Sequence, residues 1–304
     1  MKRVAAVDVG TNSVRLLVAE SAADGGLMQL ERLMTITRLG QGVDAAGRLH
    51  DDALRRTLDC IAAYAARWRE LGVTRVRLAA TSAVRDAANR DAFFDGVRAI
   101  AGVDAEVLSG EEEARTAFTG AVSSVKGEPP FLVLDIGGGS TEFILGTDRP
   151  QAETSRQMGC VRLTERCVRH DPPTDDDLAA VDAAVAAELD AVAALFDPSA
   201  ARTLVGVAGT ATTIGALHLG LAAYEPERIH GTRVPLAAVR SITARLAALT
   251  SPQRAALGPM AAGREDVIVA GAHILLRVME RFDFAEVLVS EADILDGLAR
   301  SLLA

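Results

Sequence analysis

The sequence predicts an α/β protein made of two related lobes, each built on a mixed β-sheet with helices. The main observation is a repeated segment, because DVGTNSVRLLV at 8–18 and DIGGGSTEFIL at 135–145 share an Asp, an apolar residue, a Gly and a Ser at matching spacing. Each copy follows an apolar, strand-like run, at 3–7 and at 131–134. One Asp-apolar-Gly match is weak evidence. Two copies in the same strand–turn–strand setting indicate two lobes whose turns face one ligand.

Length, composition and charge narrow the class of protein. The 304 residues are 49% hydrophobic and 24% charged, which suits about two ordinary domains with sizeable cores. Three cysteines without a CxxC pair favour a reducing compartment, so we expect a cytoplasmic protein. The N-terminus enters a strand-like run without a secretory leader, and no apolar run reaches the roughly 20 residues of a membrane span. A net charge of −9 gives no overall field for DNA or RNA.

The first lobe is expected to occupy residues 1–125 and to begin with a strand meander. Its second turn is predicted at Asp24-Gly25-Gly26, and Ser109 is predicted to cap the helix that starts SGEEEARTAF. The alternating and helical hydrophobic patterns predict strands at 2–8, 14–20, 27–36, 74–80 and 104–108, a long helix at 51–70 and shorter helices before and across 91–100.

The second lobe is expected at 126–290, after the boundary segment KGEPP, and it restarts with another strand meander. Its strands are predicted at 131–135, 141–147, 152–158, 203–208 and 286–290, and its helices at 160–169, 177–196, 235–249 and 263–281. A strand meander followed by strand–helix alternation in each half predicts mixed sheets rather than one long parallel sheet.

The first copy of the repeated turn is a candidate site for a metal and a phosphate. Asp8 ends a strand, where its carboxylate can bind Mg²⁺ directly or through water. Gly10, Asn12 and Ser13 suit a tight turn whose N–H groups can face an oxyanion. Taken alone, an ordinary hairpin with a terminal Asp explains this copy equally well.

The second copy is the stronger candidate. Asp135 precedes Gly137, Gly138, Gly139 and Ser140, and a structural turn rarely needs three consecutive glycines. Glycines let the backbone approach a phosphate closely. Because a strand follows the turn, dinucleotide binding through GxGxxG does not fit, since that motif opens a helix. No GxxxxGK[ST] segment exists, so the P-loop route to phosphate binding is closed.

Three further segments carry polar groups that suit phosphate chemistry. Gly209 and Thr210 begin a helix after a buried strand, which offers a helix N-terminus to an anion or a simple Thr cap. The segment TSAVR at 81–85 combines hydroxyls with Arg85, although a capped helix starts in the same way. Glu111–Glu113 are adjacent on a helix and point about 100° apart, so only one can face a site and act on water. Pairing with the helix dipole explains the others.

Two His-Asp pairs and a pair of cysteines could be metal ligands, but the sequence favours other roles for them. His50-Asp51 and His170-Asp171 look like the doublet of HD-type phosphohydrolases, but they stand at loop or helix starts, and the five histidines form no further ligand pattern. Cys160 and Cys167 lie two turns apart on one predicted helix, where burial explains them better than a metal.

Together these motifs resemble the exopolyphosphatase / guanosine pentaphosphate phosphatase (Ppx/GppA) family of the actin-like ATPase superfamily. The resemblance extends from Val4 to Leu298, and its markers are VDVGTNSVRLLV, AATSAVRDAANR, LSGEEEARTAF, LVLDIGGGSTEFIL, MGCVRLTE, VGVAGTATTIGAL and REDVIVAGA. Sugar kinases and chaperones of the superfamily share the Asp-Gly turns but lack the SGxEEA block. The resemblance implies two actin-like (ribonuclease H-like) lobes, an active site in the cleft between them, and a last helix at about 291–304 that packs on the first lobe.

The resemblance also implies roles for single residues. Glu113 would orient and deprotonate the attacking water, while Asp8 and Asp135 would bind Mg²⁺. A monovalent cation such as K⁺ stays open as a second cofactor. The implied phosphate-binding residues are Asn12, Ser13, Arg85, Gly137, Gly138, Gly139, Ser140, Gly209 and Thr210.

The first functional hypothesis is therefore an exopolyphosphatase that removes the terminal phosphate of inorganic polyphosphate. Many family members carry a further helical HD-like domain, and its absence here favours short chains as substrates. The alternatives are a pppGpp 5′-phosphohydrolase that gives ppGpp, a non-catalytic sensor that binds ppGpp or pppGpp, and a sugar or acid kinase. The resemblance implies a homodimer, and we expect no nucleic acid or membrane partner.

Overall fold

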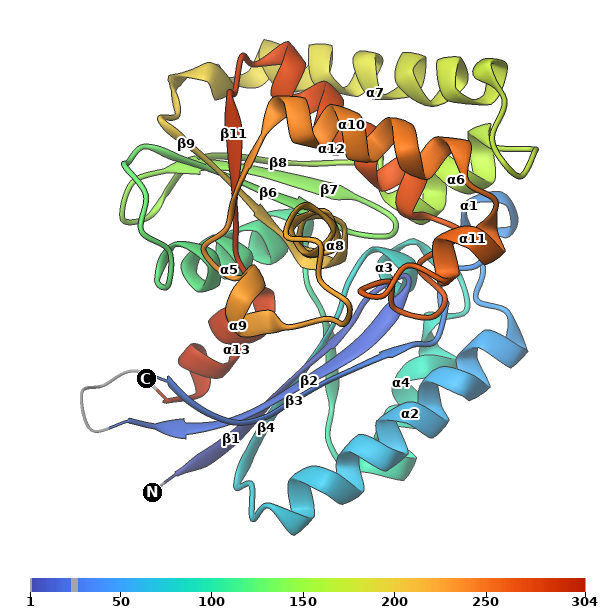
Figure 1. Cartoon of the computed structure of the whole chain (residues 1–304). Coiled ribbons are helices and arrows are strands. Elements are labelled where there is room, and N and C mark those ends of the chain that lie inside the picture. The colour runs from blue at the N-terminus through green and yellow to red at the C-terminus, as the bar shows by residue number, and fades with distance from the viewer. Residues whose placement is uncertain (1, 23–26, 304) are drawn as a thin grey trace. The chain divides into compact units, whose positions relative to one another are not determined.

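The computed structural model describes residues 2–22 and 27–303, and its contacts divide the chain into two units (Figure 1). The first unit comprises Met1–Gly120 together with Ile294–Ala304, and the second comprises Ala121–Asp293. The chain therefore passes from one unit to the other twice. The turn predicted at Asp24-Gly25-Gly26 lies outside the described residues, apart from the strands that flank it.

The first unit is built on a five-stranded mixed sheet in the order β3-β2-β1-β4-β5. The first three strands form an antiparallel meander, and β4 and β5 continue the sheet in parallel with β1. Residues Val4–Val9 of the central strand are all buried, which explains why this segment reads as an unbroken apolar run up to Asp8. The strands are β1 (Arg3–Val9), β2 (Ser13–Ser21), β3 (Leu27–Ile36), β4 (Arg75–Ala80) and β5 (Ala105–Val107).

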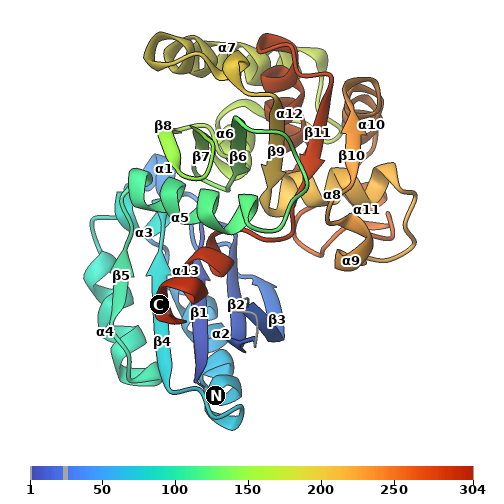
Figure 2. The ribbon, with the colours of Figure 1, turned by 90° about the vertical axis from the view of Figure 1, so that its left-hand side faces the viewer.

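Helices cover both faces of this sheet (Figure 2). On one face, α2 (Asp51–Glu70) and α4 (Arg90–Ala101) bury apolar side chains such as Trp68 and Phe93 against β1 and β2. On the other face, α13 (Ile294–Leu303) and α5 (Gly110–Val122) pack on the sheet through a second apolar cluster. The two short helices of this unit are α1 (Val43–Ala46) and α3 (Ser82–Asp86).

The second unit repeats this plan with one added edge strand. Its sheet has the order β10-β11-β9-β6-β7-β8, in which β6, β7 and β8 form the antiparallel meander and β9 and β11 run parallel to β6. The predicted α/β class with two mixed sheets is thus confirmed. The strands are β6 (Phe131–Ile136), β7 (Thr141–Gly146), β8 (Pro150–Arg156), β9 (Thr203–Val207), β10 (Arg233–Pro235) and β11 (Glu286–Val289).

Helices also surround the second sheet, and α12 is almost wholly buried among them. A large apolar cluster joins this helix to α7 and to the strands β6 and β9. The helices are α6 (Cys160–Cys167), α7 (Asp175–Leu195), α8 (Ala208–His218), α9 (Pro226–Ile229), α10 (Leu236–Ala248), α11 (Ser251–Ala255) and α12 (Ile268–Arg281), with a 3-10 turn at Pro198–Ala200.

One predicted helix is shorter than its sequence pattern suggested. The helix expected at 263–281 begins only at Ile268, and the residues before it form turns. Gly263 has a φ of +89°, which an α-helix does not accommodate. The backbone carbonyl of Glu265 accepts a hydrogen bond from the side chain of Arg254 at 2.7 Å instead of an intrahelical one. Arg264 therefore stands on a loop.

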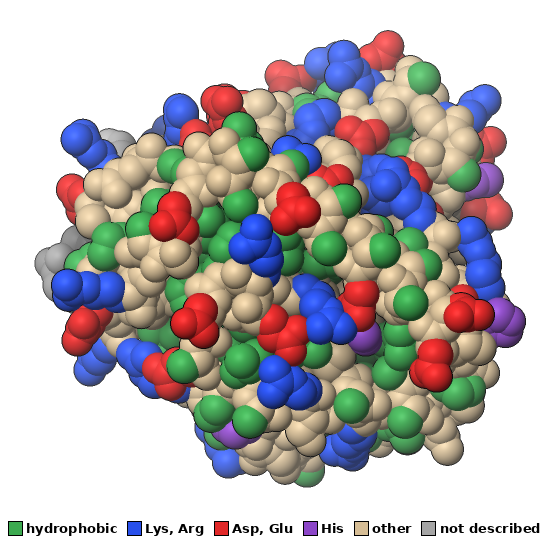
Figure 3. Space-filling model, turned by 90° about the horizontal axis from the view of Figure 1, so that it is seen from above, with side chains coloured by type: hydrophobic (Ala, Val, Ile, Leu, Met, Phe, Trp, Pro, Cys, Tyr) green, Lys and Arg blue, Asp and Glu red, His purple; other side chains and the backbone are tan. Residues whose placement is uncertain are grey.

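Charged side chains of both signs are interspersed on the face shown in Figure 3. Among the helices of the second unit, Arg240 pairs with Glu280 at 2.8 Å, and Arg277 pairs with Asp182 and Glu280. Each of these pairs joins side chains of opposite charge. Within residues 2–22 and 27–303, no helix has the length and low polarity needed to cross a bilayer.

Candidate functional site

The two copies of the repeated turn have the same local geometry. In the first, the N–H of Gly10 donates to the carbonyl of Ser13 at 2.9 Å, and in the second the N–H of Gly137 donates to the carbonyl of Ser140 at 3.1 Å. A Cβ atom at Gly10 would lie 3.3 Å from the Ser13 carbonyl, and one at Gly137 would lie 3.2 Å from that of Ser140. Glycine is therefore favoured in both copies for the same reason, a close carbonyl. The sequence repeat is a structural repeat.

The direction of the N–H groups in the first turn follows from its carbonyls. The carbonyl of Thr11 accepts from the N–H of Gly40 at 2.8 Å, and that of Asn12 accepts from the N–H of Thr37 at 3.0 Å. In a planar trans peptide, each carbonyl points opposite to the N–H of the next residue. The N–H groups of Asn12 and Ser13 consequently point away from the loop at 37–40, as donors for an anion should.

The second turn is held in the same manner by the first turn of α6. The carbonyls of Gly137 and Gly138 accept from the N–H groups of Cys160 and Val161, both at 2.9 Å. The carbonyl of Gly139 accepts from Nε of Arg162 at 2.7 Å. By the same peptide geometry, the N–H groups of Gly138, Gly139 and Ser140 face away from α6. This geometry suits the phosphate cradle that the glycine run predicts, and phosphate binding there stays a prediction.

The close fit of this cradle depends on Gly159, the residue before α6. A Cβ atom at Gly159 would lie 2.2 Å from the backbone carbon and oxygen of Gly138. The backbone of Gly138 cannot yield as a flexible side chain would. The approach of α6 to the glycine turn therefore requires glycine at position 159.

The two copies differ in the residue that faces the aspartate. On the paired strands, Asp8 stands opposite Arg15, and Nη2 of Arg15 donates to Oδ2 of Asp8 at 2.7 Å. In the second copy, Asp135 stands opposite Glu142, and both carboxylates are buried. Directly opposed residues of an antiparallel pair have their Cβ atoms about 5 Å apart on one face of the sheet. One copy thus places a cation beside its aspartate, and the other places a second carboxylate there.

Glu142 was not among the site residues predicted from the sequence. Its Oε1 accepts a hydrogen bond from Oγ of Ser155 on the neighbouring strand at 2.7 Å. The sequence does carry a signal for it, since the hairpin register around DIGGGSTE places the eighth residue opposite the first. Two buried carboxylates side by side repel unless a cation or protons compensate them.

These carboxylates can be tested for their fit to Mg²⁺. Protein-bound Mg²⁺ usually keeps several waters and takes one or two carboxylates together with substrate phosphates. Among the described residues, no group of three or more His, Cys, Asp or Glu side chains could form a metal cage. Asp135 and Glu142 supply the hard oxygen donors that such an open site needs. Asp8 shares its Oδ2 with Arg15, so the donor set favours the second turn.

Only one carboxylate of the acidic triplet is buried. Glu112 forms a capping box with Ser109, whose N–H donates to Oε2 of Glu112 at 3.0 Å, and this bond lowers the pKa of Glu112. Ser109 thus caps α5 as predicted. Glu111 is exposed and lies 3.9 Å from Arg115. Glu113 is 8% exposed, so it is the one member of the triplet placed inside the unit.

Arg85 lies directly against Glu113. Nη1 of Arg85 donates to Oε2 of Glu113 at 3.1 Å and to the carbonyl of Leu108 at 3.0 Å. Arg85 belongs to the last turn of α3, and Glu113 belongs to the first turn of α5. The predicted phosphate-binding arginine and the predicted catalytic glutamate therefore meet within the first unit.

The third predicted loop lies at the carboxyl end of β9, the strand parallel to β6. Val207 at that end stands beside Asp135, and α8 begins at the next residue, Ala208. The guanidinium of Arg264 covers Gly209, where a Cβ atom would lie 2.3 Å from Nη2. Nη1 of Arg264 donates to Oγ1 of Thr213 at 2.8 Å. Arg264 was not among the predicted site residues because it fell within a predicted helix, although it begins the REDVIVAGA marker.

Comparison with known proteins supports the reading of these motifs. The model of the Ppx/GppA phosphatase family matches residues 17–304. The chain belongs to the Ppx/GppA family. It is 44% identical over 315 residues to exopolyphosphatase 2 of Mycobacterium tuberculosis (strain ATCC 25618 / H37Rv), with 99% of each protein covered.

Two further proteins are similar to this member of the Ppx/GppA family along nearly its whole length. A solved exopolyphosphatase-like protein has a TM-score of 0.95 and 36% identity, and the match covers 100% of this chain and 99% of that one. The guanosine-5′-triphosphate,3′-diphosphate pyrophosphatase of Aeromonas salmonicida (strain A449) is 29% identical over 301 residues. That match covers 98% of this chain and 59% of the Aeromonas protein.

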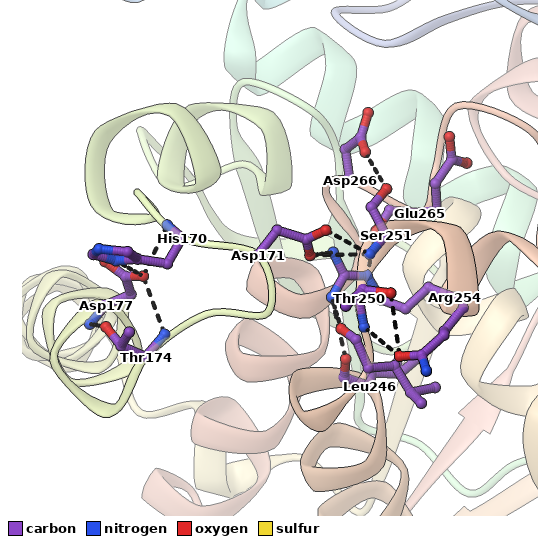
Figure 4. Close-up of polar contacts among 12 residues, drawn as sticks. His170, Asp171, Thr174, Asp177, Leu246, Thr250, Ser251, Arg254, Glu265 and Asp266 are labelled. Atoms are coloured by element: carbon purple, nitrogen blue, oxygen red, sulfur yellow. Dashed lines mark hydrogen bonds and ion pairs between the residues drawn. The ribbon is translucent and has the colours of Figure 1, made fainter.

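In this Ppx/GppA chain, the side chains of the second His-Asp pair, His170 and Asp171, contact other residues of the second unit. Nδ1 of His170 lies 3.0 Å from Oδ2 of Asp177, which also caps α7, while Asp171 pairs with Arg254 at 2.9 Å (Figure 4). His50 precedes α2 as its N-cap residue. Cys160 is buried, and its burial raises the pKa of the thiol to about 11, which suits a structural cysteine.

Proposed function

We propose that this Ppx/GppA-family chain is an exopolyphosphatase that hydrolyses the terminal phosphoanhydride bond of inorganic polyphosphate. Its class is that of the family, a hydrolase acting on phosphoanhydride bonds. The observation that carries the proposal is an asymmetry. The anion-facing turn occurs twice, at Asn12-Ser13 and at Gly138–Ser140, whereas only one glutamate of the SGEEEA triplet, Glu113, is buried, and it pairs with Arg85. Two cradles and one base suit a polyanion that is attacked at one phosphorus by water.

The proposed mechanism assigns each predicted site residue a part in one hydrolysis step. Backbone N–H groups of the two turns donate to phosphate oxygens, and Arg85 and Arg264 supply positive charge. Glu113 orients a water molecule and accepts its proton as the oxygen attacks the terminal phosphorus. The bond from that phosphorus to the bridging oxygen then breaks, which gives orthophosphate and a chain shorter by one phosphate.

We assign Mg²⁺ to Asp135 and Glu142, with Asp8 as the corresponding carboxylate of the first turn. Bound there, Mg²⁺ would neutralise charge on the phosphates that the turns hold. Short chains are the proposed substrates, because the three loops and two arginines offer donors for a few phosphates. The homodimer, the cytoplasmic location and the monovalent cation stay predictions.

The second candidate function is removal of the 5′-terminal phosphate of pppGpp. Its support is the similarity to the Aeromonas pyrophosphatase along nearly the whole chain. The bond cleaved is again a phosphoanhydride, so the same turns and the same Glu113 would serve. The two substrates therefore compete for one set of residues, and only their relative rates decide between the functions.

Orthophosphate release with Mg²⁺ tests the proposal. Tripolyphosphate, long-chain polyphosphate and pppGpp are compared at equal concentrations of terminal phosphate. We expect tripolyphosphate to lose phosphate fastest. A faster release from pppGpp assigns the second function instead. No release from any of the three, together with tight binding of ppGpp or pppGpp in calorimetry, would identify a sensor and contradict both catalytic functions.

A further inference from the structure

We propose that Arg254 and Asp171 are positioning residues, which hold Arg264 against the Gly209 loop and thereby set the affinity for the phosphate chain. The inference rests on the proposed function, in which Arg264 binds phosphate. Neither residue belongs to the repeated turns. Both lie in the network drawn in Figure 4, where the segment after α6 meets α11 and the loop that carries Arg264.

Arg254 is a buried cation, and each of its three nitrogen atoms donates to a partner. It is 3% exposed, although it stands on a helix of only five residues, α11. Its Nε donates to the carbonyl of Glu265 at 2.7 Å, its Nη2 to Oδ1 of Asp171 at 2.9 Å, and its Nη1 to the carbonyls of Leu246 and Leu249. A buried guanidinium is costly unless its donors are satisfied in this way. Arg254 therefore fixes three chain segments relative to one another.

The loop that carries Arg264 is anchored directly after that residue. The carbonyl of Glu265 is held by Arg254, and Oδ1 of Asp266 accepts from Oγ of Ser251 at 2.6 Å. Both anchors lie on α11. Two consecutive residues tied to one short helix leave the backbone of Arg264 little freedom to move.

Asp171 connects this anchor to the glycine turn. Its two carboxylate oxygens accept from the N–H of Ser251 at 2.9 and 2.8 Å, and one also accepts from Arg254. Asp171 follows α6, whose first turn binds the carbonyls of Gly137 and Gly138. The segment from Gly159 to Asp171 thus touches the phosphate cradle at one end and the anchor of Arg264 at the other. This segment therefore fixes the position of the glycine turn relative to the loop that carries Arg264.

The side chain of Arg264 packs closely against Gly209. The Arg264 guanidinium leaves no room for a Cβ atom at Gly209, and it binds Thr213 at 2.8 Å. A displacement of about 1 Å in a group that holds a substrate can cost about 100-fold in rate. Loss of the anchor should therefore weaken the action of Arg264 without removing Arg264 itself.

A double-mutant cycle separates this role from a merely structural one. Arg254→Lys and Asp171→Asn are made in the wild-type protein and in Arg264→Ala, and kcat and KM for tripolyphosphate are measured with the melting temperature. The matched control is Arg277→Lys, which perturbs the ion pair with Asp182 in the same unit. We expect Arg254→Lys to lower kcat/KM about tenfold or more, mainly through KM, and the control to leave it within about twofold.

In the Arg264→Ala background, we expect either anchor substitution to change kcat/KM less than about twofold, because the residue it positions is already absent. Equal fold-changes in both backgrounds, or unchanged kinetics in folded Arg254→Lys and Asp171→Asn, would overturn the proposal. Asp171→Asn keeps its size and its exposed position, so it reports on the anchor even where the buried Arg254→Lys protein fails to fold.

Calorimetric binding of tripolyphosphate in the absence of Mg²⁺ distinguishes a failure of the inference from a failure of the proposed function. A wild-type protein that releases no phosphate contradicts the exopolyphosphatase assignment. Binding weakened by Arg264→Ala and by Arg254→Lys, in a non-additive way, still supports the positioning role. Wild-type affinity in both variants, or no binding to the wild-type protein, contradicts it.

Discussion

Arg85 donates a hydrogen bond from Nη1 to Oε2 of Glu113 at 3.1 Å. The two residues come from motifs about thirty positions apart in the sequence, TSAVR and SGEEEA. Arg85 also binds the carbonyl of Leu108, at the residue before the Ser109 cap of α5. The guanidinium thus holds the glutamate and the start of its helix together, which fixes the position of the Glu113 carboxylate.

The first prediction concerns Glu113→Gln. Glutamine can accept the hydrogen bond from Arg85, but it cannot take a proton from water, so phosphate release should fall about 100- to 10,000-fold. Binding of tripolyphosphate should change only a few-fold, because the turns and arginines remain. Phosphate-release kinetics and calorimetry measure the two quantities.

The matched control for Glu113→Gln is Glu112→Gln, one residue earlier. Glu112 is exposed and serves the capping box with Ser109. We expect this variant to keep nearly the wild-type rate and to melt at a slightly lower temperature. A near-wild-type rate in Glu113→Gln, or an equal loss in both variants, would remove Glu113 from the mechanism.

The second prediction concerns Arg85→Lys. Arginine serves two acceptors at once, the carboxylate of Glu113 and the carbonyl of Leu108, whereas a lysine has a different geometry and reach. We expect kcat/KM to fall about tenfold or more in the wild-type background. In Glu113→Gln, the same substitution should have a much smaller effect, because residues that act as a unit are not additive. If Arg85→Lys lowers kcat/KM by the same factor in the wild type and in Glu113→Gln, the two residues do not act together.

The sequence predicted those parts of the fold and the site that depend on local pattern. The two turns follow from Asp, Gly and Ser between apolar runs, and their strands follow from the period of two. Glu142 was not predicted as a site residue because its position beside Asp135 depends on the register of the paired strands. Arg264 was not predicted because the apolar pattern of α12 placed the start of the helix at 263, whereas residues 263–267 form a loop to which Arg254 is hydrogen-bonded. The pairing of Arg85 with Glu113 is tertiary, and no spacing in the sequence encodes it.

The third prediction concerns Gly159→Ala. The added Cβ would lie 2.2 Å from the backbone of Gly138, so α6 or the glycine turn must move. Because the carbonyls of this turn are bound by α6, its N–H groups should lose their alignment, and kcat/KM should fall about 100-fold. A suitable control is Gly102→Ala, where a Cβ meets nothing within 4 Å but φ is +70°. That variant should lose about 1–2 kcal/mol of stability and keep its rate. Equal kinetics in the two variants would contradict the role of the contact.

The fourth prediction concerns Mg²⁺. Chelation with EDTA should abolish phosphate release, and Glu142→Gln should raise the Mg²⁺ concentration needed for half-maximal rate about tenfold or more, because one of two adjacent carboxylates is lost. Glu188→Gln removes a half-buried carboxylate of α7 that pairs with Arg156 and does not belong to the paired strands of the turn, and it should leave that concentration unchanged. The rate is titrated with Mg²⁺ at a fixed tripolyphosphate concentration. An unchanged requirement in Glu142→Gln would exclude this carboxylate from the metal site.

The fifth prediction concerns the acid stability that Asp177 provides. Burial opposes ionisation of this carboxyl group, but hydrogen bonds from the N–H of Thr174, from His170 and from the N–H of Arg169 outweigh it and lower its pKa to about 2. The ordinary value is about 3.9, so the stabilisation is present above about pH 4 and is lost as the pH falls toward 2. Asp177→Asn should melt a few degrees below the wild type at pH 6, and the difference should narrow between pH 4 and pH 2. Asp176→Asn alters the charge at the same helix end without breaking these bonds, so its smaller difference at pH 6 serves as the control. A difference for Asp177→Asn that stays constant down to pH 2 would show that its stabilising contacts do not depend on ionisation.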